Sequence, residues 1–173
     1  MKKIFIVSAK RTPIGKFMGS LSTFSAAEMG TKVIKAILDE TKIDPAIIDT
    51  VIVGNVLSGG LKQGVGRQCA IGAGIPHEKT AYSINMVCGS GMKAVMNACT
   101  DISQGYASVV IAGGTESMSN AGFILQGNLR SGVKMGNMQA VDHMVNDGLT
   151  DAFGEYHMGI TAENPAGDRK SVV

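Results

Sequence analysis

Hydrophobic residues recur along the chain in two alternating patterns up to about residue 114. Residues 4–7 form a short continuous apolar run, as expected of a strand that is buried on both faces, and the segments 50–53, 80–86 and 107–112 are predicted to be three further strands. Between these runs, apolar residues return every three or four positions, which is typical of amphipathic helices. The order strand, helix, strand, helix, strand, helix, strand predicts an α/β fold with a mostly parallel sheet flanked by helices.

The predicted helices carry start and stop signals of their own. Ser25 and Glu28 match the capping-box pattern at the start of the first helix, which should end between residues 40 and 42. A second helix is predicted over residues 65–74. The third should begin just after Cys88 and stop at Gly105. Its apolar positions recur at helical spacing and are predicted to pack in the core; they are Met92, Val95, Met96, Cys99 and Ile102.

The pattern changes after residue 114. Residues 115–160 are rich in Gly, Met, Asn and Ser and show no clear period. Loops of this length inside compact domains are usually functional or bound to a partner. We therefore divide the chain into a core half-domain (1–114), an excursion (115–164) and an atypical tail (165–173), where Pro165 and Gly167 should stop a helix.

Composition and charge exclude several classes of function. The chain has 173 residues, of which 45% are hydrophobic and 17% charged, as suits a single well-buried domain. A net charge of +2, with both signs interspersed, provides no basic stripe for nucleic acid and no polybasic patch for a membrane surface. The apolar run at 4–7 is too short for a signal peptide or a transmembrane span. Three cysteines without a close pair argue against a disulfide scaffold or a zinc site and favour a reducing cytoplasm.

Cys88 is the strongest candidate for chemistry. It stands where a β-like stretch meets the start of a helix, and the unpaired N–H groups there favour a thiolate. A thiolate is a nucleophile for acyl transfer. Gly89 and Gly91 carry no Cβ, which should let a bulky substrate approach the sulfur. The alternative role for a cysteine, a small apolar core residue, is predicted for Cys69 and Cys99.

Four blocks of the sequence, in the same order, resemble the thiolase family, whose members condense acyl-CoA thioesters. The blocks are residues 11–17, 84–95, 112–119 and 156–164. The resemblance covers roughly residues 1–164 and is greatest to the bacterial short-chain, biosynthetic type. It implies a thiolase-like half-domain in which the excursion at 115–164 helps to build the CoA site and the contacts of a homotetramer.

The resemblance also implies a reaction and a set of site residues. The reaction is a Claisen condensation of two acetyl-CoA to acetoacetyl-CoA plus CoA, and the reverse thiolysis, catalysed by an acyltransferase through acyl-Cys88. The resemblance places His157 close to the acyl-CoA, Met158 in the pocket near the thioester and Leu149 against the CoA chain. It implies no metal, no cofactor besides the CoA of the substrate, a cytoplasmic location and a place in fatty acid and ketone metabolism. His77 and His143 receive no such role and are predicted to lie on the surface.

Two features of the family are missing from these residues. The family places its catalytic base histidine and a second, acid–base cysteine later in the chain, in Gly-His-Pro and Cys-x-Gly-Gly-Gly blocks that do not occur here. We therefore expect an N-terminal half that exposes apolar surface and does not turn over acetyl-CoA alone, although Cys88 should still be acylated slowly. Two alternatives remain open: another condensing enzyme of the same superfamily, such as a ketosynthase-like enzyme, or a non-catalytic fragment or assembly module.

Overall fold

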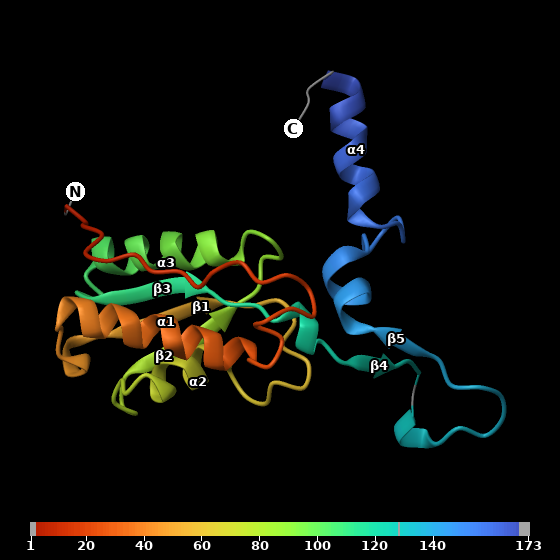
Figure 1. The fold of residues 1–173 in the computed structure, drawn as a ribbon, viewed down its shortest axis with the longest axis horizontal. Coiled ribbons are helices and arrows are strands. Elements are labelled where there is room, and N and C mark those ends of the chain that lie inside the picture. Colours follow the sequence, from red (N-terminus) through yellow and green to blue (C-terminus); the bar gives the residue numbers. More distant parts are fainter. Residues whose placement is uncertain (1–2, 128, 170–173) are drawn as a thin grey trace. The chain divides into compact units, whose positions relative to one another are not determined.

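The computed structural model describes residues 3–127 and 129–169, with side chains as far as residue 164, and divides into two compact units after Asn120. The first unit alternates helices and strands (Figure 1). Its elements are α1 (Ala26–Thr41), β1 (Thr50–Gly54), α2 (Val65–Gly72), β2 (Thr80–Ile84), α3 (Ser90–Gln104) and β3 (Val110–Gly114), with short 3-10 turns at Pro45–Ile47 and Met118–Asn120. The predicted α/β class, with a parallel sheet flanked by helices, is confirmed.

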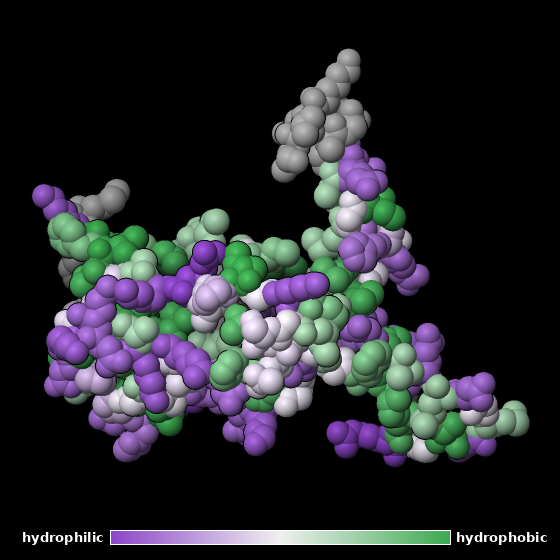
Figure 2. Space-filling view, in the orientation of Figure 1, coloured by the Kyte–Doolittle hydropathy of each residue, from purple (hydrophilic) through white to green (hydrophobic). Residues whose placement is uncertain are grey.

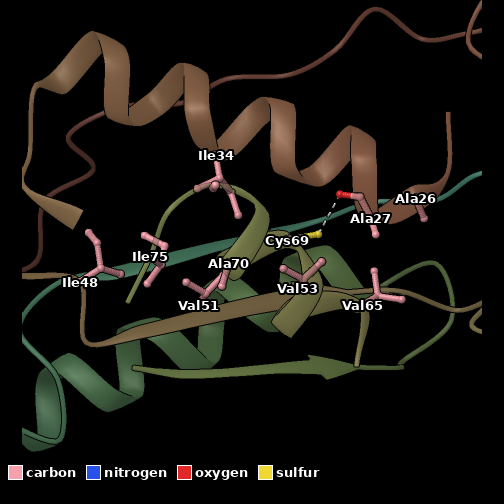
Figure 3. Close-up of a cluster of buried hydrophobic side chains, with 11 residues drawn as sticks. Ala26, Ala27, Ile34, Ile48, Val51, Val53, Val65, Cys69, Ala70 and Ile75 are labelled. Carbon is pink, nitrogen blue, oxygen red and sulfur yellow. Dashed lines mark hydrogen bonds between the residues drawn. The ribbon is translucent and has the colours of Figure 1, made fainter. Parts of the chain in front are cut away.

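The sheet of the first unit is parallel throughout and has the strand order β2-β1-β3. Its central strand β1 is buried on both faces. Val51 and Val53 point into one cluster of apolar side chains, beneath α1 and α2 (Figure 3), and Ile52 points into a second cluster beneath α3. This arrangement explains why β1 reads as a continuous apolar run and not as an alternating one.

Helices α1 and α2 pack closely on one face of the sheet. Cys69 of α2 is fully buried there, and its thiol donates a hydrogen bond to the carbonyl of Ala27, with a sulfur–oxygen distance of 3.5 Å (Figure 3). Burial raises the pKa of the Cys69 thiol to about 11. A Cβ on Gly30 of α1 would lie 2.5 Å from this sulfur, so the two helices meet without space for another atom. The prediction that Cys69 is a core residue is confirmed.

Helix α3 covers the opposite face, and it does so with small residues. Its buried positions are Ser90, Ala94 and Ala98, spaced four apart on one side of the helix. The predicted core stripe was therefore wrong for most of its members: Met92 (72% exposed), Val95, Met96 and Cys99 lie on the outer side. Alanines occupy the inner side of α3 because a helix with small residues on that side can approach the sheet closely. Apolar surface is exposed on this side of the unit, as expected (Figure 2).

The predicted first strand at residues 4–7 is not formed. Phe5, Ile6 and Val7 are 75%, 84% and 74% exposed, and within the described residues β3 pairs only with β1. An apolar run indicates only that a segment is suited to burial. A strand also needs a neighbouring backbone to complete its hydrogen bonds, which periodicity cannot reveal. The segment is attached to α1 instead, since Ser8 and Lys10 both bind the carboxylate of Glu40.

The boundaries of α1 follow the predicted signals. The Ser25 hydroxyl accepts from the backbone N–H of Glu28 (3.2 Å), and the Glu28 carboxylate accepts from the N–H of Ser25 (2.8 Å), so the capping box is complete. The helix ends at Thr41, inside the predicted range, and Lys42 follows with φ 55°.

The second unit contains short elements in place of the aperiodic excursion read from the sequence. It has an antiparallel pair, β4 (Phe123–Leu125) and β5 (Ala140–Asp142), a 3-10 turn (Leu129–Ser131), a π-helix (Met144–Leu149) and the helix α4 (Met158–Arg169). The prediction that Pro165 stops a helix was wrong, because α4 passes through it. Proline lacks the N–H that would donate to the carbonyl of Thr161 and its ring crowds that carbonyl, so a proline disfavours a helix but does not by itself end one. Across the part of the chain that the structure describes, no helix has the length and hydropathy to cross a bilayer.

The two histidines without an assigned role behave differently. His77 is exposed, as predicted, with 91% of its side chain accessible. His143 is only 6% exposed, so its predicted surface position was wrong. The Nε2 atom of His143 lies 3.1 Å from a carboxylate oxygen of Asp147, one turn further along the chain, and this partner makes burial of the imidazole possible.

Asp49, just before β1, should make the stability of the first unit depend on pH. The backbone N–H of Ser108 (2.7 Å), followed by that of Val109 (3.1 Å), holds the pKa of the Asp49 carboxyl below its usual value. A lowered pKa in the folded state stabilises the fold at neutral pH, and this stabilisation disappears as the pH falls through that pKa. We expect Asp49→Asn to lower the free energy of unfolding by about 1 kcal/mol at neutral pH. In urea titrations from neutral to acidic pH, its difference from the wild type should shrink, whereas exposed Asp39→Asn should show no such trend. A gap that stays constant with pH would contradict this role.

Candidate active site

The turn between β2 and α3 presents Cys88 at the surface. β2 ends at Ile84, α3 begins at Ser90, and the thiol of Cys88 is exposed between them. This turn follows the carboxyl end of a strand in a parallel sheet, which is where open α/β folds bind their ligands. The sulfur is therefore open to a substrate and not enclosed in the core.

Val87, immediately before Cys88, has a left-handed backbone conformation with φ 47°. A β-branched residue is among the least suited to this conformation, which costs about 1–3 kcal/mol for a residue other than glycine. A nucleophile on a sharp, strained turn from strand to helix is also the arrangement of the α/β-hydrolases, where it exposes the reacting atom above the sheet. The strain at Val87 indicates that surrounding contacts hold this turn in place.

Ser90 supplies most of those contacts. Its side chain is buried (4% exposed), and its hydroxyl accepts from the N–H of Met86 (2.8 Å) and donates to the carbonyl of Val87 (2.6 Å). The backbone N–H of Ser90 also donates to the Val87 carbonyl (3.1 Å). On the other side of the strained residue, the Asn85 side-chain oxygen accepts from the N–H of Val87 (2.9 Å). Both peptide groups that flank Val87 are thus fixed by side chains.

Glycines at two strand ends let the start of α3 approach the sheet. A Cβ on Gly54, the last residue of β1, would lie 2.5 Å from the carbonyl carbon of Ser90 and 2.6 Å from the nitrogen of Gly91. Gly114, the last residue of β3, meets the Cα of Gly91 in the same way, at 3.2 Å from its ideal Cβ position. A Cβ on Gly89 would meet the Met86 side chain at 2.6 Å. The close approach of α3 therefore requires the absence of a side chain at Gly54, a role that the sequence did not reveal, whereas a Cβ on Gly91 would meet no atom closer than 3.7 Å and the atom that faces Gly89 is the flexible end of Met86.

Glu116 fixes the loop that follows β1, beside the same edge of the sheet. Its carboxylate accepts from the Asn55 side-chain amide (2.8 Å) and from the backbone N–H groups of Val56 (2.8 Å) and Leu57 (3.2 Å). The Asn55 amide also donates to the carbonyl of Thr115 (3.1 Å). These bonds connect the segments that leave β1 and β3, the two strands against which α3 begins.

The amino-terminal end of α3 offers positive potential next to Cys88. Gly89 is the N-cap residue, no side chain caps the helix there, and its first turn contains no acidic residue. Free N–H groups at a helix start favour a thiolate or the oxyanion of a tetrahedral intermediate, but here the N–H groups of Gly89 and Ser90 already donate to the carbonyls of Met86 (3.0 Å) and Val87 (3.1 Å). That the N–H of Cys88 itself serves as an oxyanion donor stays a prediction. A shallow pocket of about 290 Å³ opens nearby, lined by Asn55, Ser83, Ile84 and Asn85 among others; Cys88 stands outside it.

The predicted substrate residues Leu149, His157 and Met158 lie in the second unit. An antiparallel bridge between Thr150 and His157 closes a short loop, so Leu149 and Met158 are each adjacent in sequence to a bridged residue. The Nδ1 atom of His157 accepts from the N–H of Gly159 (3.0 Å) at the start of α4. A ring nitrogen that accepts carries no proton, so the exposed imidazole presents Nε2–H as a donor in its neutral form. The structure brings these three residues together within their unit, whereas Cys88 belongs to the first.

Comparison with known proteins identifies the family. A family model described as "Thiolase, N-terminal domain" matches residues 4–170. The chain belongs to the thiolase family. Cytosolic acetyl-CoA acetyltransferase of Mus musculus is 50% identical over 163 residues, and acetyl-CoA acetyltransferase of Chromobacterium violaceum is 52% identical over 164. The crystal structure of the Acat5 thiolase from Ascaris suum in complex with coenzyme A superposes with a TM-score of 0.86 at 38% identity, over 92% of this chain.

This thiolase chain spans about two fifths of the length of those relatives. The matches cover 92–95% of it but 41% of the mouse protein, 42% of the bacterial protein and 41% of the Ascaris chain. The family predicted from the four sequence blocks is thus confirmed, as is the correspondence with the N-terminal domain. Among the side chains that the structure describes, in residues 3–127 and 129–164, three or more His, Cys, Asp or Glu nowhere gather in a way that could hold a metal ion.

Sequence reasoning missed three residues that shape the thiolase turn: Gly54, Ser90 and Glu116. Ser90 and Glu116 lie within recognised blocks and Gly54 directly follows a predicted strand, yet their contacts join positions between 4 and 61 residues apart. The signals available in the sequence were a glycine directly after each of two predicted strands and an acidic residue, Glu116, in the third block, shortly after the predicted strand at 107–112. Neither signal indicates which residue lies in contact with the glycine or the carboxylate, so these roles could be assigned only from the structure.

Proposed function

We propose that this chain supplies the nucleophile half of an acetyl-CoA acetyltransferase, with Cys88 as the residue that becomes acylated. The observation that carries the proposal is the exposed thiol of Cys88 on a strained turn at the uncapped start of α3. Cys69, by contrast, is enclosed in the core, where its thiol is not open to a substrate.

The first step is acyl transfer from acetyl-CoA to the enzyme. The Cys88 sulfur attacks the thioester carbonyl carbon, and the new bond between sulfur and carbon forms a tetrahedral oxyanion. The oxyanion is stabilised by N–H groups at the start of α3. Collapse breaks the bond between that carbon and the sulfur of CoA; CoA leaves and takes up the proton that the Cys88 thiol released. The products are acetyl-Cys88 and free CoA, and the step needs no separate cofactor.

The second unit is proposed to contact the substrate. His157 would donate from Nε2–H to the acyl-CoA, since its Nδ1 is engaged by Gly159. Met158 would line the region near the thioester and Leu149 would touch the CoA chain. The crystal structure of the Ascaris thiolase is a complex with coenzyme A, which supports CoA as the common part of the ligand.

The condensation itself belongs to the longer proteins of the family. Removing a proton from a second acetyl-CoA requires a base, and the corresponding histidine and cysteine blocks do not occur in these 173 residues. We propose that the complete reaction joins two acetyl-CoA into acetoacetyl-CoA and CoA and also runs in reverse. We expect this chain alone to perform the acylation without sustained turnover. A homotetramer, a cytosolic location like that in the mouse relative's name, and a place in fatty acid and ketone metabolism complete the proposal.

Acetylation of Cys88 is the direct test. Purified protein incubated with acetyl-CoA should gain one acetyl group by mass spectrometry, and peptide mapping should place it on Cys88. Cys88→Ser should remove the adduct completely. Cys99→Ser is the matched control: it removes the other exposed thiol, on the same helix, and should leave the adduct in place.

A second control separates the fold from the thiol. In urea, the unfolded wild type retains the Cys88 sulfur but loses the turn, so acetylation should fall to the rate of Cys99. A folded wild type without adduct, or an adduct that persists in Cys88→Ser, would overturn the proposed function. Sustained production of acetoacetyl-CoA by this chain alone would contradict the expectation that it stops at the acyl-enzyme.

A further inference from the structure

Val87 has the one backbone conformation in the Cys88 turn that its own side chain opposes. Its φ of 47° belongs to the left-handed region, where a β-branched residue is rare. Left to itself, such a residue would rotate to a negative φ. Because Val87 directly precedes Cys88, that rotation would redirect the peptide group that carries the nucleophile.

Two side chains hold Val87 against this rotation. The Ser90 hydroxyl donates to the Val87 carbonyl (2.6 Å) while accepting from the N–H of Met86 (2.8 Å), so it joins the peptide groups on the two sides of the turn. The Asn85 oxygen accepts from the N–H of Val87 (2.9 Å). Any change of φ or ψ at Val87 moves one of these groups away from its partner.

Ser90 is itself immobile, which makes it the stronger of the two anchors. It is 4% exposed, and the space beside it is so limited that a Cβ on Gly54 would lie 2.8 Å from the Ser90 Cβ. It is also the first residue of α3. Asn85, by contrast, is exposed.

We propose that Ser90 is a positioning residue: its hydroxyl holds Val87 in the left-handed conformation and thereby fixes the direction in which Cys88 presents its sulfur. The inference rests on the proposed function, since it concerns the same nucleophile. It adds that acyl transfer depends on a hydroxyl that does not contact the substrate.

Four variants test this role: Ser90→Ala, Val87→Asn, the double variant, and Thr100→Ala as the control. Thr100 is on the same helix and its hydroxyl also donates to a backbone carbonyl, that of Met96 (3.1 Å), but it is exposed and lies beyond the turn. We expect Ser90→Ala to slow acetylation of Cys88 by acetyl-CoA about 10- to 100-fold, as misplacement of a reacting atom does. Alkylation of Cys99 in dilute solution should be unchanged and provides the internal standard, and Thr100→Ala should behave as wild type.

Rescue separates positioning from general stability. Asparagine adopts the left-handed region more readily than valine, so Val87→Asn should restore most of the rate lost in Ser90→Ala. NMR scalar couplings should show a negative φ at residue 87 in Ser90→Ala and a positive φ in the double variant. If Ser90→Ala does not fold, Asn85→Ala replaces it, because Asn85 is exposed and should give a smaller loss that Val87→Asn also reverses.

The outcomes distinguish this inference from the function on which it rests. A wild type that is not acetylated overturns the proposed function, while the φ of Val87 in Ser90→Ala still tests the role of Ser90. An acetylated wild type with equal rates in Ser90→Ala overturns the positioning role. A loss in Ser90→Ala that Val87→Asn does not reduce, or a φ that stays positive without the hydroxyl, overturns it as well.

Discussion

Gly54→Ala should lower the free energy of unfolding by about 3 kcal/mol and also abolish acetylation of Cys88. The added methyl group would lie 2.5 Å from the carbonyl carbon of Ser90 and 2.6 Å from the nitrogen of Gly91, and both are backbone atoms that cannot rotate aside. The start of α3 must therefore move off β1. Because Cys88 precedes that start directly, its turn moves too, and stability and acylation should fall together. Urea denaturation and mass spectrometry with acetyl-CoA measure the two effects.

Gly113→Ala is the matched control. Gly113 is paired with Val53, one residue before the pair formed by Gly54 and Gly114, and a Cβ on Gly113 would meet no atom within 4 Å. Its stability should change by less than about 1 kcal/mol, and acetylation should persist. If both substitutions lowered stability and acetylation equally, the loss would come from replacing a flexible glycine at a strand end and not from a clash with the start of α3.

Glu116→Ala should be the second most damaging substitution, with an expected loss of about 3 kcal/mol, because it leaves three hydrogen-bond donors without their acceptor. The donors are the Asn55 amide and the N–H groups of Val56 and Leu57. The side-chain oxygen of Asn55 is already buried without a hydrogen-bond partner, so loss of the carboxylate would leave a second polar atom of this side chain with fewer bonds. Loss of the carboxylate should loosen the loop after β1, which hydrogen exchange at Val56 and Leu57 would detect.

Glu116→Gln should lower the free energy of unfolding by less than Glu116→Ala does. Glutamine keeps one acceptor oxygen but turns an amide N–H₂ group toward donors, so it should cost about 1–2 kcal/mol. Glu78→Gln removes the charge of a carboxylate whose side chain is 64% exposed, and its stability should stay within about 0.5 kcal/mol of the wild type. An unchanged stability in Glu116→Ala would mean that water replaces the carboxylate fully.

Local signals in the sequence predicted most of the fold. Ser25 and Glu28 define the start of α1 because a capping box involves residues only three apart. The apolar run at 50–53 predicted β1 because a strand covered on both faces needs no alternation. The run at 4–7 carried the same signal and failed, since the signal says nothing of a pairing partner.

The candidate site also contains features that local signals in the sequence predicted and features that depend on residues elsewhere in the fold. Cys88 could be found from its neighbours in the chain, and the family resemblance gave it a role. The left-handed conformation of Val87 could not be found, because valine is a residue that argues against it. The burial of His143 depends on Asp147, and the exposure of Cys99 depends on alanines that occupy the inner side of α3. Spacing along a helix indicates a stripe but not which of two apolar sides meets the sheet.

The outer side of α3 gives the protein a built-in reporter of its own association. Cys99 lies among the exposed Met92, Val95 and Met96, so whatever covers those side chains also shields that thiol from alkylation. Slower labelling of Cys99 as the protein is concentrated would reveal a partner molecule on this side without any added dye or tag.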